Sequence, residues 1–313
     1  MRLGFFLPQI GPLAGPVNLT HVAARAEEVG YDSLWTTERL LFPLETTAPY
    51  PVGDGTIPEV YKTVLDPLDA LAFVAAQTSR IALGTSILNL PWYNPVLIAR
   101  RLTSLDVLSS GRLRVGFGIG WSPEEYQAAG VSWSNRGRRF EEALRLIKLI
   151  WTADPVEFEG AFYRVPRASI GLKPVQTPHP PVYLAAYAPA ALERVAANSN
   201  GWNPVGIPLA GIAEMWRGIR SSAEAAGRDP RELQLIVRAN IELTSEPLGE
   251  GRTEFTGSVA ELTDDFARTA EIGADELIID PTFDPSVHSV DDLFVRLESF
   301  KAAHTRLAMG APA

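Results

Sequence analysis

The stretch Ile81-Ala-Leu-Gly-Thr-Ser-Ile-Leu-Asn-Leu-Pro-Trp-Tyr-Asn-Pro95 contains a buried strand, a turn and the start of a helix. Its apolar first half predicts a strand over residues 81–87, and Pro95 suits the first turn of a helix over residues 95–108. The strand ends in the small polar pair Thr85-Ser86 instead of continuing with apolar residues. We therefore expect a pocket to begin at this strand end.

The same alternation of short strand and longer helix continues on both sides of this stretch. Strands are predicted over residues 3–7, 33–36, 81–87, 113–117, 182–185, 202–205, 235–241 and 276–280. Helices are predicted over residues 19–29, 67–77, 95–108, 139–151, 190–197, 212–226, 259–272 and 290–304. About eight such units in 313 residues indicate a (β/α)8 TIM barrel.

The long irregular segments read as insertions in one barrel domain over residues 1–313. They lie at about residues 37–66, 154–181 and 245–257, and the second contains a predicted hairpin that turns at Glu159-Gly160. A doubly wound sheet in two lobes is the alternative, because it also alternates strands and helices. It usually has a domain linker, and these segments fall within the rhythm instead.

Composition excludes several classes of partner. The formal charge is -9 and no dense basic run occurs, which argues against nucleic-acid binding. Apolar runs of about 18 residues and a signal peptide of the usual form are both missing, so no membrane association is expected. The absence of cysteine is compatible with the cytoplasm, where we expect the protein. A small molecule is the expected partner.

Common catalytic motifs are also missing. The chain has neither the P-loop pattern nor the G-x-S-x-G nucleophile elbow. Its four histidines, His21, His179, His288 and His304, fall outside the predicted strand ends and lack zinc-ligand spacing, so no metal site is expected. A barrel without these groups at its active face indicates that a bound organic cofactor performs the chemistry.

The segment Gly116-Phe-Gly-Ile-Gly-Trp-Ser-Pro-Glu124 follows a predicted strand. Its spacing is G-x-G-x-G, which differs from the dinucleotide-binding pattern G-x-G-x-x-G. We interpret the glycines as positions where the backbone approaches a flat ligand. A plain glycine-containing loop is the alternative interpretation.

In its order of motifs the chain resembles the luciferase-like monooxygenase superfamily, and within it the oxidoreductases that depend on the deazaflavin coenzyme F420. The resemblance rests on segments along nearly the whole chain: Leu3–Pro8, Gly30–Trp35, Leu83–Ile87, Asn94-Pro95, Gly116–Glu125, Arg136–Phe140, Gly171–Val175, Pro178–Pro181 and Ala185–Ala191. It implies a non-proline cis peptide at Ser86-Ile87 behind the cofactor ring. It also implies that the Ala185–Pro189 segment holds the cofactor phosphate at a helix N-terminus.

From the resemblance and the strand positions we assign residues to cofactor binding. They are Pro8, Thr85, Ser86, Ile87, Gly118, Gly120, Trp121, Ala185, Ala186, Tyr187, Ala188 and Arg238. Arg238 is a charge on an otherwise apolar strand and is expected to contact phosphate or the polyglutamate tail. Several aromatic residues are expected to line or floor the pocket, and some of them to lie in the core: Trp35, Trp92, Tyr93, Trp121 and Trp202.

Two positions depart from the resemblance. Many relatives have an Asp-His pair after the second strand, where this chain has Glu38-Arg39, and a later catalytic Glu of the sugar-phosphate dehydrogenases is replaced by Trp121. That proton-transfer mechanism therefore does not carry over. Glu38 is a candidate acid or base, and Arg39 a candidate for binding an anionic substrate or the reduced cofactor. A merely structural Glu38-Arg39 pair is the alternative.

The resemblance implies an enzyme that transfers hydride between F420 and an unidentified small organic substrate. The first alternative is an FMN-dependent monooxygenase that uses O2 and receives reduced flavin from a partner flavin reductase. A non-catalytic protein that binds flavin or deazaflavin is the second. Analogy with the family suggests a homodimer.

Overall fold

The computed structural model describes residues 1–309 and shows a closed barrel of eight parallel strands. The strands are β1 (Arg2–Phe6), β2 (Ser33–Thr36), β3 (Ala82–Thr85), β5 (Leu113–Gly118), β8 (Val182–Leu184), β9 (Gly201–Trp202), β10 (Gln234–Asn240) and β13 (Glu276–Asp280). Each pairs with the next, and β1 closes the ring against β13 with Gly4 opposite Ile278. The predicted TIM barrel is confirmed.

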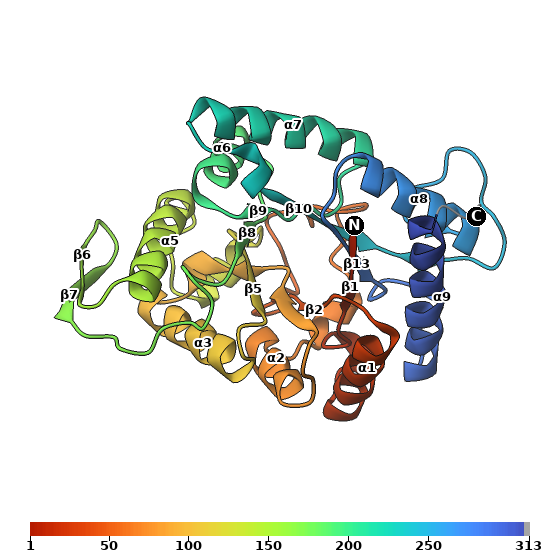
Figure 1. The fold of residues 1–313 in the computed structure, drawn as a ribbon, viewed down its shortest axis with the longest axis horizontal. Helices are drawn as coiled ribbons and strands as arrows, with labels where there is room; N and C mark the ends of the chain where they lie inside the picture. Colours follow the sequence, from red (N-terminus) through yellow and green to blue (C-terminus); the bar gives the residue numbers. More distant parts are fainter. Residues whose placement is uncertain (310–313) are drawn as a thin grey trace.

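Helices surround the barrel on all sides (Figure 1). They are α1 (Pro16–Val29), α2 (Pro67–Ala75), α3 (Pro95–Leu108), α4 (Pro123–Ala128), α5 (Arg136–Thr152), α6 (Pro189–Asn198), α7 (Leu209–Ala225), α8 (Val259–Glu271) and α9 (Val290–Ala308). Several of these helices begin with a side chain that caps their first backbone amides. Asn94, for example, accepts a hydrogen bond from the Val96 amide at 2.9 Å at the start of α3.

The third predicted strand is shorter than expected. It ends at Thr85, the Ser86-Ile87 peptide is cis, and pairing resumes in β4 (Leu88–Asn89), where Leu88 lies opposite Phe117 of β5. The chain then passes through a 3-10 turn, η3 (Leu90–Trp92), into α3. Helix α5 begins at Arg136, three residues before the predicted start, because its first turn is polar and does not show in the apolar stripe.

The barrel interior is filled by large side chains. Phe6, Trp35, Tyr183, Ile236 and Ile278 pack together there, and Trp35 is fully buried. Two glycines leave room for its ring: a Cβ at Gly4 would lie 2.7 Å from Trp35 Nε1, and one at Gly84 would lie 2.3 Å from Trp35 Cε3. Trp35 is thus a core residue.

The insertions have their own local structure. The segment after β2 contains η2 (Glu59–Lys62), and the segment after α5 forms an antiparallel hairpin of β6 (Val156–Glu159) and β7 (Arg164–Ala168). The hairpin lies outside α5 (Figure 1). Because Glu159 pairs with Arg164, its turn spans residues 160–163 and not the predicted Glu159-Gly160 pair.

The third insertion is bounded by the short strands β11 (Glu242–Leu243) and β12 (Thr256–Gly257), which pair in parallel. The remaining 3-10 turns are η1 (Gly11–Leu13) and η4 (Pro230–Glu232). Within residues 1–309, the helices are all too short or too polar to cross a membrane.

Candidate active site

A cavity of about 610 Å³ opens at the carboxyl ends of the barrel strands. Its walls come from residues that follow β2, β3, β5, β8 and β9, from Arg238 in β10, and from the insertion after β2. Enzymes with this fold carry their chemistry at the same end of the barrel. Many of the residues assigned from the sequence meet here: Glu38, Arg39, Ser86, Ile87, Gly118, Gly120, Trp121, Ala185, Ala186, Tyr187, Ala188 and Arg238.

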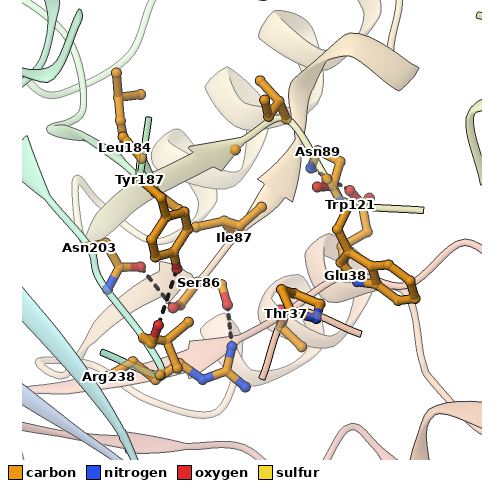
Figure 2. Close-up of a pocket in the computed structure, with 18 of the residues that line it drawn as sticks. Thr37, Glu38, Ser86, Ile87, Asn89, Trp121, Leu184, Tyr187, Asn203 and Arg238 are labelled. Atoms are coloured by element: carbon orange, nitrogen blue, oxygen red, sulfur yellow. Dashed lines mark hydrogen bonds between the residues drawn. The ribbon is translucent and has the colours of Figure 1, made fainter. Parts of the chain in front are cut away.

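Ser86 is held on three sides at the bottom of this cavity. Its amide donates to the Thr36 carbonyl at 2.6 Å, its hydroxyl donates to Asn203 Oδ1 at 2.8 Å, and its carbonyl accepts from Arg238 Nη1 at 2.7 Å. Figure 2 shows the last two bonds. It also shows the Ile87 side chain between Asn203 and Arg238 on one side and Asn89, Trp121 and Glu38 on the other. The wall formed by Ser86 and Ile87 is therefore rigid and largely apolar.

Arg238 is occupied by partners of its own. Its Nε and Nη2 donate to Asp280 Oδ2 at 2.9 and 2.5 Å, and its guanidinium lies 4.3 Å from the centroid of the Phe6 ring. Both charges are buried. Three of its five N–H groups are used by Asp280 and Ser86, and the expected contact of Arg238 with a phosphate or polyglutamate stays a prediction.

The glycines of β5 are required by the chain itself. A Cβ at Gly116 would lie 2.1 Å from the Thr85 carbonyl oxygen, and one at Gly118 would lie 2.5 Å from Ile87 Cδ1. Gly120 has a φ of +68°, and its Cβ would lie 2.9 Å from Asn89 Oδ1. These positions make room for the segment from Thr85 to Asn89, so our interpretation of a glycine backbone open to a ligand is only part of the explanation.

Glu38 is buried in the cavity wall opposite Arg238. Its Oε2 accepts from the Asn89 amide at 2.6 Å, and its Oε1 accepts from the Tyr93 hydroxyl. Burial raises the pKa of Glu38 to about 7, and these two hydrogen bonds oppose the rise because they stabilise the ionised form. A carboxyl with this pKa can both donate and accept a proton near neutral pH.

Arg39 forms an ion pair with a residue that sequence reasoning missed. Its Nη2 lies 2.8 Å from Glu125 Oε2, while Glu125 Oε1 accepts from the Leu40 amide at 2.8 Å. The guanidinium also lies 4.8 Å from the Trp121 ring centroid and 5.3 Å from that of Tyr61. Glu125 ends the glycine-rich segment quoted for the resemblance, but nothing local indicates that it reaches Arg39, 86 positions away.

The outer end of the cavity lies at the start of α6. Ala188 is the N-cap of this helix and makes no side-chain capping bond, and Arg194 lines the cavity from the second turn. Arg194 Nη2 lies 2.6 Å from Glu141 Oε1, and Glu141 is half exposed. Tyr187 is 48% exposed and donates to the Val205 carbonyl at 3.3 Å. This end is therefore open to solvent, and it combines the uncapped amides of a helix start with an arginine that is paired with a carboxylate.

The insertion after β2 covers another part of the mouth. The Tyr50 and Tyr61 hydroxyls lie 3.1 Å apart, and the Tyr50 ring packs edge-on against Trp121 at a centroid distance of 5.4 Å. Glu124 in α4 accepts a hydrogen bond from the Thr47 amide at 2.9 Å and so connects this segment to α4. Sequence analysis placed this insertion at about residues 37–66 but did not identify Tyr50 and Tyr61.

Several expected residues lie elsewhere. Pro8 lines a second, separate hollow together with Phe6, Pro281 and Phe283. Thr85 is fully buried, does not line the cavity, and its hydroxyl donates to the Gly116 carbonyl at 3.0 Å.

Among the aromatic candidates, Trp121 lines the cavity and Tyr93 binds Glu38 from behind. Trp202 is a fully buried core residue, and its Nε1 donates to the Ala186 carbonyl at 2.9 Å. Trp92 packs edge-on against Tyr126 and does not line the cavity. Tertiary packing thus decided which of the aromatic residues reach the site.

A family model described as "Luciferase-like monooxygenase" matches residues 1–246. The chain belongs to this family. This luciferase-like protein is 33% identical over 234 residues to the F420-dependent glucose-6-phosphate dehydrogenase of Amycolatopsis mediterranei, an alignment that covers 72% of the chain and 65% of the dehydrogenase.

Solved structures share the fold of this luciferase-like protein. The monooxygenase RslO1 from Streptomyces bottropensis superposes with a TM-score of 0.81 at 21% identity, covering 98% of this chain and all of that one. An F420-dependent secondary alcohol dehydrogenase, solved with an F420–acetone adduct, superposes with a TM-score of 0.76 at 17% identity, covering 96% of this chain and 97% of that one. At these identities the likeness concerns the fold.

Proposed function

We propose that this luciferase-like protein is an oxidoreductase that binds coenzyme F420 and acts on a small organic substrate. The observation that carries the proposal is the 33% identity to an F420-dependent dehydrogenase over 234 residues, which is 72% of this chain. We do not propose the substrate of that relative for this chain. In this chain Trp121 and Glu38-Arg39 depart from the pattern of the sugar-phosphate enzymes.

The residues present fit a flat ring with an anionic tail. One side of the cavity is apolar and rigid, with Ile87, Leu184 and Ala185 as its surface. A Cβ at Gly118 would already meet Ile87 at 2.5 Å, so the side chain of Ile87 is fixed from behind. The anionic tail would lie toward the start of α6, where backbone amides lack a side-chain cap and Arg194, paired with Glu141, lines the cavity. When bound there, a deazaflavin supplies hydride transfer.

The protein's own contribution is orientation and a proton. Ser86, held by Arg238 and Asn203, keeps Ile87 in place. The carboxyl group of Glu38 can hold or release a proton near neutral pH, because burial raises its pKa to about 7. Tyr93 and the Asn89 amide orient that carboxyl group toward the cavity. Tyr50, Tyr61 and Trp121 pack against one another at the mouth of the cavity and shield the part beside Glu38 from water.

The proposal is tested by equilibrium titration of the purified protein with F420 and with FMN, each oxidised and reduced, followed by tryptophan and cofactor fluorescence. We expect F420 to bind at least about tenfold more tightly than FMN, a difference of about 1.4 kcal/mol. Preferential binding of FMN, together with O2 uptake in the presence of reduced FMN, would overturn the proposal in favour of a flavin monooxygenase. Tight binding of either cofactor without turnover of any alcohol or carbonyl compound would support a non-catalytic carrier.

A further inference from the structure

Each arginine that lines the cavity is paired with a carboxylate. Among the described residues, the lining side chains that carry a carboxylate or a guanidinium are Glu38, Arg39, Arg194 and Arg238. The two inner arginines each have a fully buried carboxylate as partner: Glu125 for Arg39, and Asp280 for Arg238. Each pair therefore adds no net charge to the inner half of the cavity.

Both partner carboxyl groups accept hydrogen bonds through both of their oxygens. Glu125 accepts from Arg39 through Oε2 and from the Leu40 amide through Oε1. Asp280 accepts from Arg238 through Oδ2 and from the Thr282 amide at 3.0 Å through Oδ1. Both oxygens of each carboxyl group are therefore used within these contacts. Each arginine has its partner inside the same buried cluster.

An anionic substrate would find each cation of this inner half already paired with a carboxylate. Recognition of phosphate or carboxylate usually takes two parallel N–H donors from a guanidinium whose charge is available. Three of the five N–H groups of Arg238 already donate to Asp280 and Ser86. Arg39 already donates to Glu125, and the rings of Tyr61 and Trp121 pack against its guanidinium. Burying a further anion here would leave its lost hydration uncompensated. Glu38, when ionised, would repel it.

Three buried polar atoms of the lining residues have no hydrogen-bond partner, and they suit a ligand with one hydroxyl or carbonyl group. Asn89 Oδ1, Trp121 Nε1 and Arg39 Nε are buried without a hydrogen-bond partner, and all three residues line the cavity. They offer separate single donors and one acceptor beside Glu38, and Figure 2 shows Asn89, Trp121 and Glu38 on the same side of Ile87. Hydroxyl and carbonyl oxygens match such isolated partners. The surrounding surface, formed by Tyr50, Val52 and Tyr61, is aromatic or aliphatic.

We propose that the half of the cavity bounded by Glu38, Arg39, Tyr61 and Trp121 binds an uncharged, mainly apolar molecule that carries one carbonyl or hydroxyl group, and that it excludes phosphorylated and carboxylated compounds. This inference rests on the proposed function, because it takes the Ile87 side of the cavity as the place of the cofactor. It separates the chain from its relative that acts on glucose 6-phosphate. The oxygen of the bound molecule lies within reach of the Glu38 carboxyl group.

Ligand-observed NMR and calorimetry on the F420-loaded protein test this inference, with cyclohexanone as the uncharged probe and glucose 6-phosphate as the anionic one. We expect cyclohexanone to bind at least about tenfold more tightly. The decisive variant is Glu125→Gln, which keeps the shape of the side chain but leaves the charge of Arg39 uncompensated. Its affinity for glucose 6-phosphate is expected to rise at least about tenfold, while its affinity for cyclohexanone stays within about twofold.

The matched control is Glu159→Gln, which makes the same change of net charge at an exposed carboxylate of the β6–β7 hairpin. It should leave both affinities unchanged. Tighter binding of glucose 6-phosphate than of cyclohexanone by the wild type would overturn the inference, as would failure of cyclohexanone to bind, or a folded Glu125→Gln variant with unchanged anion affinity. If that variant does not fold, the ranking of the two probes on the wild type decides. Failure of F420 itself to bind would instead contradict the proposed function.

Discussion

The guanidinium of Arg238 in β10 donates from Nη1 to the carbonyl oxygen of Ser86 at 2.7 Å, joining positions 152 residues apart. The same side chain is paired with Asp280 of β13. One buried cation thus ties the ends of three strands together at the bottom of the cavity. The position of Ile87, which follows Ser86 directly, depends on this contact.

We expect Arg238→Met to weaken both the fold and the site. The variant leaves Asp280 buried without its counter-charge, which typically costs about 3–5 kcal/mol of unfolding free energy, and it releases the Ser86 carbonyl. Affinity for F420 should fall at least about tenfold. Urea unfolding and F420 titration measure the two effects. The control Arg231→Met removes an exposed arginine that pairs with Asp229, and should change stability by less than about 0.5 kcal/mol. Unchanged F420 affinity in a folded Arg238→Met protein would show that the contact does not support the site.

The raised pKa of Glu38 predicts a specific pH dependence of stability. The folded protein holds this proton up to about pH 7, whereas the unfolded chain releases it near its ordinary pKa of 4.5. The unfolded state therefore binds fewer protons between these values, and unfolding free energy falls as the pH rises through this window. From pH 5 to pH 8 the wild type should lose roughly 2–3 kcal/mol relative to Glu38→Gln. Parallel urea curves for the two proteins at both pH values would contradict the assignment.

Removal of the Tyr93 hydroxyl should raise the pKa of Glu38 further. The hydroxyl donates to Glu38 Oε1 and so stabilises the ionised carboxylate. In Tyr93→Phe the carboxyl group should titrate at a higher pH than in the wild type, visible in the carbonyl stretch of 13C-glutamate-labelled protein, with Glu38→Gln identifying the band. Tyr163→Phe, which changes a tyrosine beside the β6–β7 hairpin, serves as the comparison and should leave the band unmoved. A downward shift in Tyr93→Phe would mean that the hydroxyl accepts from a protonated Glu38 instead.

Gly120 and Gly130 have the same backbone φ, but only Gly120 lies at the site. Comparing alanine variants of the two therefore distinguishes the cost of backbone strain from an effect on binding. Gly120 and Gly130 both have a φ of +68°, but a Cβ at Gly120 would lie 2.9 Å from Asn89 Oδ1, whereas Gly130 has open space around it. Alanine at either position should cost about 1 kcal/mol through the left-handed conformation. Only Gly120→Ala should also displace Asn89 and reduce F420 affinity, by at least about threefold. Equal affinities in the two variants would remove Gly120 from the binding surface.

Much of the site could be located from the sequence because it follows a local pattern. Strand and helix periodicity placed Ser86, Gly118, Ala185 and Arg238 at the carboxyl end of the barrel, where they meet in one cavity. Thr85 and Pro8, both assigned to cofactor binding, lie outside this cavity. The side chain of a strand residue points either to the barrel interior or to the surrounding helices. Alternation along so short a strand does not decide between the two.

The sequence by itself determined the barrel, the end at which its cavity lies and the family to which it belongs, because all three follow from periodicity and short motifs along the chain. Only the tertiary structure decided the charge balance of that cavity. Arg39 meets Glu125, 86 positions away, and Arg238 meets Asp280, 42 positions away. Such pairs form only when the closed ring of strands brings distant side chains into one buried space, and burial then determines which of them, such as Glu38, keeps a proton.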